Sequence, residues 1–337
     1  MPNLRTQDEI LANWGGKTDP VVSVSCITYN HEPYIRDAIE GFLIQETDFP
    51  FEVLIYDDAS TDKTADIIRE FEALYPAIII PIYQTENQYS KGVSVSCVYN
   101  FSRARGDYIA LCEGDDYWIC AEKLHLQVKV FLADLDCSMV FHPAHYITGT
   151  SKEFLREVGR YRANAIFDIE RILERGGGFY PTASAMLRRS VLTGQRPEWA
   201  KGYRPGDFAL GILAAYYGRI LYIDRTMSVY RWHADSVNHG EGYKTLSRSL
   251  NRFKKDIQLV NWLRHNRPDV PTLRFELSSL YKLASLKAKV SDSLLFVRSI
   301  SPSRWPLVVA VFLLKRIYYR ITGKVPAIRI TTSSNLE

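Results

Sequence analysis

The chain has 337 residues, a formal net charge of +4 and 46% hydrophobic residues. This composition is typical of a globular protein and excludes an intrinsically disordered one. The small net charge argues against a nucleic-acid-binding protein, which usually contains a strongly basic domain. The length favours about two domains.

The first half of the chain alternates between strand and helix patterns. Apolar and β-branched runs predict strands over residues 21–28, 51–56, 78–83, 107–112 and 137–141. Helical spacing of apolar residues predicts helices over 33–45, after the turn at 57–62, over 93–103 and over 124–132. Such alternation predicts an α/β fold with a mostly parallel central sheet and helices on both faces.

The middle of the chain is less regular. Residues 142–180 form an excursion that ends at three consecutive glycines, 176–178. After it we expect a short strand over 182–187, a helix over 207–217 and two more strands over 220–223 and 227–231.

The last part of the chain differs in charge from the rest. Residues 241–337 contain 18 Lys and Arg against 6 Asp and Glu, a net charge of +12, whereas residues 1–240 contain 24 against 32, a net charge of −8. We therefore predict a domain over 1–240 and a basic, helix-rich region over 241–337.

The sequence also bears on location. The five cysteines form no Cys-x-x-Cys pair, and the N-terminus lacks the apolar core of a signal peptide, so we expect a cytoplasmic protein with reduced thiols. The longest apolar run, 305–314, would make a helix of about 15 Å, roughly half of a bilayer core. Flanking Lys, Arg and Tyr residues suit peripheral contact with the inner face of the plasma membrane, and a basic helical subdomain packed on protein is the alternative.

Polar segments follow three of the predicted parallel strands. They are Tyr29-Asn30-His31-Glu32, Asp57-Asp58 and Glu113-Gly114-Asp115-Asp116. Because open parallel sheets bind ligands beyond the carboxyl ends of their strands, we expect these segments to form one site. The turn after the first strand has no Gly-x-Gly-x-x-Gly, which argues against a nicotinamide-dinucleotide fold.

The acidic trio Glu113, Asp115 and Asp116 predicts a site for Mg²⁺ or Mn²⁺. Crowded carboxylates repel one another unless a cation neutralises them, and a hard divalent ion takes oxygen ligands from carboxylates and substrate phosphates. The alternative is a solvated acidic turn that caps the next helix.

The order of Thr28-Tyr29-Asn30, Asp57-Asp58-Ala59-Ser60-Thr61-Asp62 and Glu113-Gly114-Asp115-Asp116 resembles the family 2 glycosyltransferases, which have the GT-A fold. The resemblance implies an inverting transferase that uses a nucleotide-diphosphate sugar and a divalent metal. It implies metal ligation by Asp115, with Asp116 and Glu113 beside it, although Glu113 replaces the commoner Asp. The candidate nucleotide-binding residues are Thr28, Tyr29, Asn30, Glu32, Asp57, Asp58 and Asp115.

The resemblance extends into the second half of the chain. Asp207 opens a predicted helix where the family places its catalytic base, although Gly206 stands where many members have Glu. The alternative for Asp207 is a helix N-cap. Tyr230-Arg231-Trp232-His233 resembles the segment that ends the family's catalytic domain, which makes Arg231 and His233 candidate contacts to the diphosphate.

These observations predict a metal-dependent inverting glycosyltransferase of bacterial surface-polysaccharide synthesis. The expected donor is a nucleotide-diphosphate sugar, with UDP favoured, and the expected acceptor is a glycan or a lipid-linked saccharide. Two alternatives remain at this stage. A sugar-nucleotide nucleotidyltransferase normally has a Gly-rich basic loop after its first strand, which this chain lacks. The other is a non-catalytic scaffold that binds a sugar nucleotide or a membrane.

Overall fold

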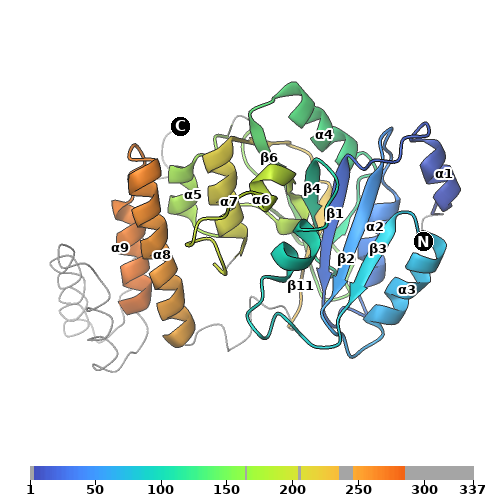
Figure 1. Cartoon of the computed structure of the whole chain (residues 1–337), viewed down its shortest axis with the longest axis horizontal. Helices are drawn as coiled ribbons and strands as arrows, with labels where there is room; N and C mark the ends of the chain where they lie inside the picture. The colour runs from blue at the N-terminus through green and yellow to red at the C-terminus, as the bar shows by residue number, and fades with distance from the viewer. Residues whose placement is uncertain (1–3, 164, 204–205, 235–245, 285–337) are drawn as a thin grey trace. The chain divides into compact units, whose positions relative to one another are not determined.

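The computed structural model describes residues 4–163, 165–203, 206–234 and 246–284 (Figure 1). The chain divides into two compact units, residues 1–240 and 241–337.

The first unit is built on a seven-stranded sheet in the order β10-β6-β9-β4-β1-β2-β3. In chain order the strands are β1 (Val22–Thr28), β2 (Phe51–Asp57), β3 (Ile79–Tyr83), β4 (Tyr108–Leu111), β6 (Cys137–Phe141), β9 (Met186–Arg188) and β10 (Arg219–Tyr222). Within this sheet β9 runs antiparallel to both of its neighbours, and the other pairs of strands are parallel. The prediction of a mostly parallel central sheet is confirmed.

The alternation of side chains along β1 explains why helices cover both faces. Val22, Val24 and Cys26 are fully buried in the core that also contains Ala38 and Phe42 of α2 (Ile35–Leu43). On the other face the Asn100 side chain, from the π-helix η1 (Ser96–Phe101), donates to Ser25 Oγ at 3.2 Å. The remaining helices of this unit are α1 (Gln7–Ala12), α3 (Thr64–Leu74), α4 (Lys123–Ala133), α5 (Ile169–Arg175), α6 (Arg189–Thr193) and α7 (Gly206–Tyr217).

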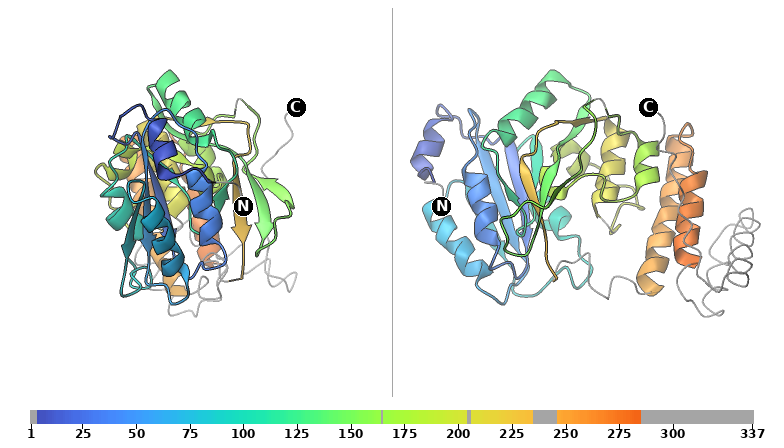
Figure 2. Two further views of the ribbon diagram at one scale, coloured as in Figure 1. Left: turned by 90° about the vertical axis from the view of Figure 1, so that its right-hand side faces the viewer. Right: turned by 180° about the vertical axis from the view of Figure 1, so that it is seen from behind.

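A second, four-stranded sheet lies beside the first (Figure 2). Its order is β5-β11-β7-β8, formed by β5 (Tyr117–Trp118), β11 (Ser228–Trp232), β7 (Ala144–Thr148) and β8 (Arg156–Val158). The sequence indicated only β11 among these strands, because β5 and β8 are too short to show alternation. The strand expected over 182–187 is partly wrong, since Thr182–Ser184 form a 3₁₀ turn, η2, before β9 begins.

The second unit contains two described helices, α8 (Leu246–Asn266) and α9 (Leu273–Ala284). Arg264 of α8 forms an ion pair with Glu276 of α9, and Thr272 donates to the same carboxylate at 3.0 Å. Among the described helices none is long and apolar enough to cross a membrane. The apolar run at 305–314 lies outside the described residues.

Lys123, at the start of α4, is a fully buried cation in the first unit. Its Nζ donates to Gln127 Oε1 at 2.8 Å and lies 3.9 Å from the centre of a Trp118 ring. Gln127 in turn donates to the carbonyl oxygens of Val140 and Ser184. Burial lowers the pKa of Lys123 to about 7, so the folded protein holds this proton less tightly than the unfolded chain does.

We predict that replacing Lys123 with Met removes a pH-dependent contribution to stability. Between about pH 7 and pH 10.5 the unfolded chain binds a proton at Lys123 that the folded chain lacks, so Lys123 destabilises the fold less as the pH rises. From pH 7 to pH 9 the free energy of unfolding of the natural protein should therefore rise by about 2 kcal/mol relative to that of Lys123→Met. Urea unfolding of both proteins at the two pH values measures this, and a constant difference would contradict the shifted pKa.

Candidate functional site

The carboxyl edge of the main sheet brings the three polar segments together. Thr28 and Asp57 are the last paired residues of β1 and β2. The acidic segment, residues 113–116, follows β4, and the Gly114 amide donates to the Ile27 carbonyl oxygen at 2.9 Å. The acidic segment therefore lies directly against the end of β1.

The absence of a side chain at Gly114 permits this close approach. A Cβ at this position would lie 2.6 Å from Oγ1 of Thr28 and 3.0 Å from Nδ1 of His31. Any larger residue must move the acidic segment away from β1 or displace these two side chains.

Reciprocal hydrogen bonds join the loop after β1 to the loop after β2. Asn30, with a positive φ of 53°, donates from its amide to Ser60 Oγ at 2.9 Å, and its Oδ1 accepts the Thr61 amide at 2.8 Å. The Glu32 carboxylate accepts the Lys63 amide at 3.1 Å. Both side chains thus shape the site from within the loops, whereas Tyr29 is 43% exposed.

The two carboxylates at the end of β2, Asp57 and Asp58, are buried and already accept hydrogen bonds. Asp57 accepts the hydroxyl and the amide of Ser60, and burial, partly offset by these bonds, raises the pKa of its carboxyl. Asp58 accepts the Tyr56 hydroxyl at 3.0 Å and the amides of Gln88 and Tyr89 at 2.7 and 3.0 Å. Asp58 therefore holds the loop that follows β3.

Asp115 lies between two imidazoles. His233 Nε2 is 3.0 Å from Asp115 Oδ2, and His31 Nε2 is 4.0 Å from the same oxygen. Burial raises the pKa of the Asp115 carboxyl, but the hydrogen bond with His233 and the nearby His31 outweigh it, so the pKa is lowered overall. One donor atom from each of these three side chains lies within 4.8 Å of the others, close enough to hold one metal ion.

Arg231 fixes the acidic segment to the small sheet. Its amide donates to Asp116 Oδ1 at 2.8 Å, and its Nε donates to the Asp115 carbonyl oxygen at 2.8 Å. The guanidinium also binds the Asp37 carboxylate at 2.9 Å and the Gly149 carbonyl oxygen. With 1% of its side chain exposed, Arg231 acts here as a support for the segment.

Glu113 is within electrostatic reach of a second carboxylate site, formed by Asp207. Burial, together with Asp115 and Asp207, raises the pKa of Glu113 to about 8. The Asp207 carboxylate accepts the amides of Phe208 and Gly178, each at 2.8 Å, and the Tyr180 hydroxyl donates to the Asp207 carbonyl oxygen at 3.1 Å. These bonds hold the start of α7 to the glycine-rich turn at 176–178, and the Asp207 carboxylate is near enough to Glu113 to contribute to its raised pKa.

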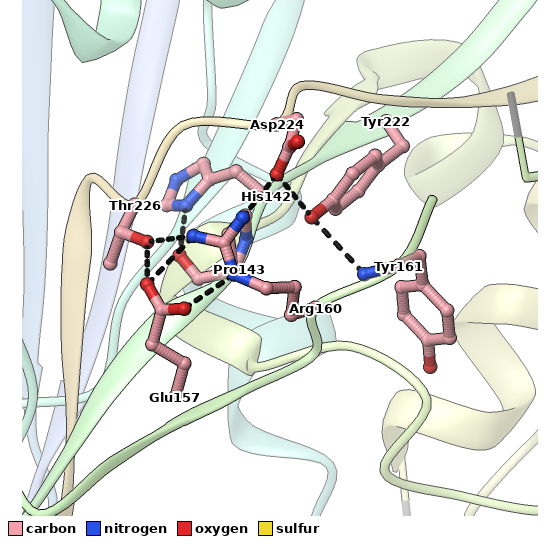
Figure 3. Close-up of polar contacts among 8 residues, drawn as sticks. All are labelled: His142, Pro143, Glu157, Arg160, Tyr161, Tyr222, Asp224 and Thr226. Atoms are coloured by element: carbon pink, nitrogen blue, oxygen red, sulfur yellow. Dashed lines mark hydrogen bonds and ion pairs between the residues drawn. The ribbon is translucent and has the colours of Figure 1, made fainter. Parts of the chain in front are cut away.

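A polar cluster around Arg160 anchors the excursion that leads to Tyr180 (Figure 3). Arg160 pairs with Glu157 and Asp224 and donates to Thr226 at 3.3 Å. Next to it, the Tyr161 amide donates to the Tyr222 hydroxyl at 3.2 Å (Figure 3). The Tyr161 hydroxyl then donates to the Phe179 carbonyl oxygen at 2.5 Å, which fixes the residue before Tyr180.

The structure groups the predicted residues differently from the sequence. Glu113, Asp115 and Asp116 are neighbours, but Asp115 faces the histidines, Asp116 faces the Arg231 amide and Glu113 lies near Asp207. The sequence pattern did not mark His31 or Tyr180 as site residues. His31 stands within the quoted segment after the first strand, which was the available signal, whereas nothing in the sequence pattern indicates Tyr180.

Comparison with known proteins identifies the family. Residues 23–194 match the model of glycosyl transferase family 2. An uncharacterized protein of Mycobacterium tuberculosis H37Rv is 38% identical over 220 residues, which cover 65% of this chain and 60% of that protein. TuaG of Bacillus subtilis, named as a teichuronic acid biosynthesis glycosyltransferase, is 34% identical over 131 residues, 39% of this chain and 48% of TuaG.

Solved structures show the same fold. Staphylococcus aureus TarS, residues 1–349 with UDP-GlcNAc, has a TM-score of 0.58 and 17% identity, with 90% of this chain and 88% of that one covered. The mannosyltransferase PcManGT of Pyrobaculum calidifontis, with GDP-Man and Mn²⁺, has a TM-score of 0.50 and 18% identity, with 93% of each chain covered. At these identities the likeness concerns the fold alone, and it confirms the predicted GT-A fold.

The chain belongs to glycosyl transferase family 2, and its first unit is a glycosyltransferase domain of GT-A fold. The resemblance drawn from the sequence is thereby confirmed, and relatives of the chain include a protein of bacterial polysaccharide synthesis.

We predict that Gly114→Ala destabilises the fold and weakens nucleotide binding together. The added Cβ would collide with Thr28 Oγ1, which should lower the free energy of unfolding by about 1–3 kcal/mol. Nucleotide binding, measured by calorimetry with UDP and Mn²⁺, should weaken in parallel because the acidic segment must shift. Gly206→Ala is the matched control, since among the described residues, its chain neighbours aside, no atom lies within 4 Å of a Cβ there. Equal behaviour of the two variants would contradict the proposed collision.

Proposed function

We propose that this protein transfers a sugar from a nucleotide-diphosphate donor, with UDP favoured, to a hydroxyl of a glycan or lipid-linked acceptor, with inversion at the anomeric carbon. The observation that carries the proposal is the meeting of two acidic centres at one sheet edge, Asp115 between His31 and His233, and Asp207 near Glu113. A leaving diphosphate needs a cation at the first centre, and an incoming hydroxyl needs a base at the second.

The first centre fits a divalent metal. Asp115, His31 and His233 each offer a ligand atom within 4.8 Å of the others, and Asp115 Oδ1 is buried with no hydrogen-bond partner among the described residues, although such atoms are normally satisfied. A ligand set of one carboxylate with His31 and His233 favours Mn²⁺ over Mg²⁺, because Mg²⁺ prefers oxygen ligands alone. When bound, the metal would neutralise the charge of the departing diphosphate. Asp116 and Arg231 would then position Asp115, because Arg231 binds both residues.

Asp207 is the proposed base. Its carboxylate accepts two backbone amides, which orient it. Glu113, whose pKa is raised to about 8, would keep a proton at neutral pH and so reduce the repulsion between the two centres. Thr28, Tyr29, Asp57 and Asp58 line the edge on which the nucleotide is proposed to bind.

The location of the protein is also proposed. The net charge of +12 over residues 241–337 suits reversible attachment to the anionic cytoplasmic face of a membrane, where each basic residue contributes about 1 kcal/mol. A lipid-linked acceptor would be found at that surface.

We predict that Asp115→Asn and Asp207→Asn separate metal binding from proton abstraction. Asp115→Asn should weaken Mn²⁺-dependent UDP binding about 10- to 100-fold, because a carboxylate ligand is lost. Asp207→Asn should lower the turnover number about 10²- to 10⁴-fold while UDP still binds, because the amide cannot accept the proton. Calorimetry with UDP and sugar release from a panel of nucleotide sugars, each with Mn²⁺ or EDTA, measure both effects.

Asp66→Asn is the matched control for these variants, since its carboxylate forms an exposed ion pair with Arg69 on α3. Undiminished activity in EDTA would overturn the metal site, and full activity of Asp207→Asn would overturn the base. Proton NMR of the product gives the anomeric configuration, and retention would contradict the proposed inversion.

For the membrane proposal we predict that the full chain floats with anionic liposomes at low salt and remains in the bottom fraction with neutral ones. Raising the salt concentration should release it, because exposed charges are screened beyond a Debye length. Equal flotation with both liposomes, or none with either, would reject electrostatic attachment.

A further inference from the structure

A row of side chains crosses the small sheet, starting at the acidic segment. In the β5–β11 pair Ser228 is opposite Trp118 and Val229 is opposite Tyr117, so the next residues in register are Tyr230 and Asp116. Tyr230 is paired with Tyr146 of β7, and Tyr146 with Arg156 of β8. Because directly paired residues project from the same face of a sheet, Tyr230, Tyr146 and Arg156 form one continuous row.

The side chains of this row contact one another. The ring centres of Tyr146 and Tyr230 are 5.9 Å apart, and the Arg156 guanidinium lies 4.5 Å from the centre of the Tyr146 ring. Both tyrosines are half-buried and Arg156 is exposed. Within the described part of the chain, none of these three side chains forms a hydrogen bond or an ion pair with another residue. The row is thus an aromatic surface that ends in an available cation.

The inner end of the row faces the acidic centre. The Arg231 amide, next in sequence to Tyr230, donates to Asp116 Oδ1, which places this part of β11 against the acidic segment. Burial raises the pKa of the Tyr230 hydroxyl, and so do the carboxylates of Asp116, Glu113 and Asp115. The phenol is therefore within the electrostatic reach of these groups. The row leads from the proposed reaction centre outward to Arg156.

We propose that Tyr230, Tyr146 and Arg156 bind the acceptor, and that this acceptor is an anionic saccharide. The apolar face of a sugar ring would stack on the tyrosines, and a phosphate or carboxylate next to that ring would pair with the Arg156 guanidinium. The inference rests on the proposed transfer reaction. The nucleotide is proposed to bind along β1 and β2, whereas the row extends across the small sheet, so the two ligands would approach the acidic centre on different strands.

Saturation-transfer NMR on the full chain, with UDP and Mn²⁺ at saturating concentration to occupy the donor site, tests the proposal. The probes are methyl glycosides of glucose, GlcNAc and mannose, the matching 1-phosphates and methyl glucuronide. We expect an anionic probe to bind more tightly than its neutral partner, and the phosphate and uronate arms to identify which anion is used. Arg156→Gln should remove this preference, with about a tenfold loss for the anionic probe and no change for the neutral one.

Tyr146→Ala should weaken all bound probes on the order of tenfold, and Tyr146→Phe should retain them because the ring is kept. The controls are Arg175→Gln, which removes another exposed arginine placed 5.0 Å from a tyrosine ring centre, and Tyr217→Ala, which removes a 50% exposed tyrosine on α7. Neither control should change probe binding.

Three results would overturn the acceptor assignment. The first is that no probe binds the natural protein at about 10 mM, which corresponds to an affinity too weak for a subsite. The second is that Arg156→Gln keeps the same preference for anionic probes as the natural protein. The third is that Arg156→Gln binds UDP more weakly, which would place Arg156 on the donor side. Failure of UDP to bind the natural protein would instead count against the proposed function. In that case the loss of probe binding in Tyr146→Ala would still test whether Tyr230, Tyr146 and Arg156 bind a saccharide.

Discussion

The burial of several carboxylates against the end of one strand is the constraint on which the site depends. Asp115 and Asp116 lie beside β1 because Gly114 has no side chain. Glu113 is close enough to the Asp115 and Asp207 carboxylates for its pKa, already raised by burial, to be raised further. Like charges in such a place are tolerated only with compensation. His233 and His31 supply it at Asp115, whose pKa is lowered, whereas burial and the neighbouring carboxylates raise the pKa of Asp116 and Glu113.

This compensation makes the small sheet part of the site. Arg231 and His233 come from β11 and the residue after it, and both reach the acidic segment more than a hundred residues earlier in the chain. Arg231 also binds Asp37 of α2, so one buried guanidinium connects both sheets to the helix that follows β1. The geometry of Asp115 therefore depends on side chains of the small sheet, and a loss of Arg231 would leave the half-buried Asp37 carboxylate without its partner on this sheet.

The sequence predicted the parts of the fold that follow from local patterns. The strands β1, β2 and β3 and their helices show clear periodicity, and the carboxyl ends of parallel strands must share an edge. The sequence could not predict which carboxylate faces which partner. The pairing of Asp115 with His233 is set by long-range register in β11, and the contact of Asp207 with the glycine turn depends on the irregular excursion before it. The family resemblance indicated candidate roles for Asp115 and Asp207, which periodicity could not do, but it did not indicate His31.

Structural and functional interpretations of the polar loop residues are compatible. Asn30, Glu32, Asp57 and Asp58 all accept hydrogen bonds from nearby backbone or hydroxyl groups, as a turn or cap residue would. These bonds fix the loops at the edge where a nucleotide is proposed to bind, and such pre-organisation lowers the entropy cost of binding. A carboxylate oxygen has more than one lone pair, so Asp57 can hold its turn and still accept a hydrogen bond from a ligand. Catalytic groups in this fold are therefore best distinguished from structural ones by variants that keep the internal bond and change only the charge.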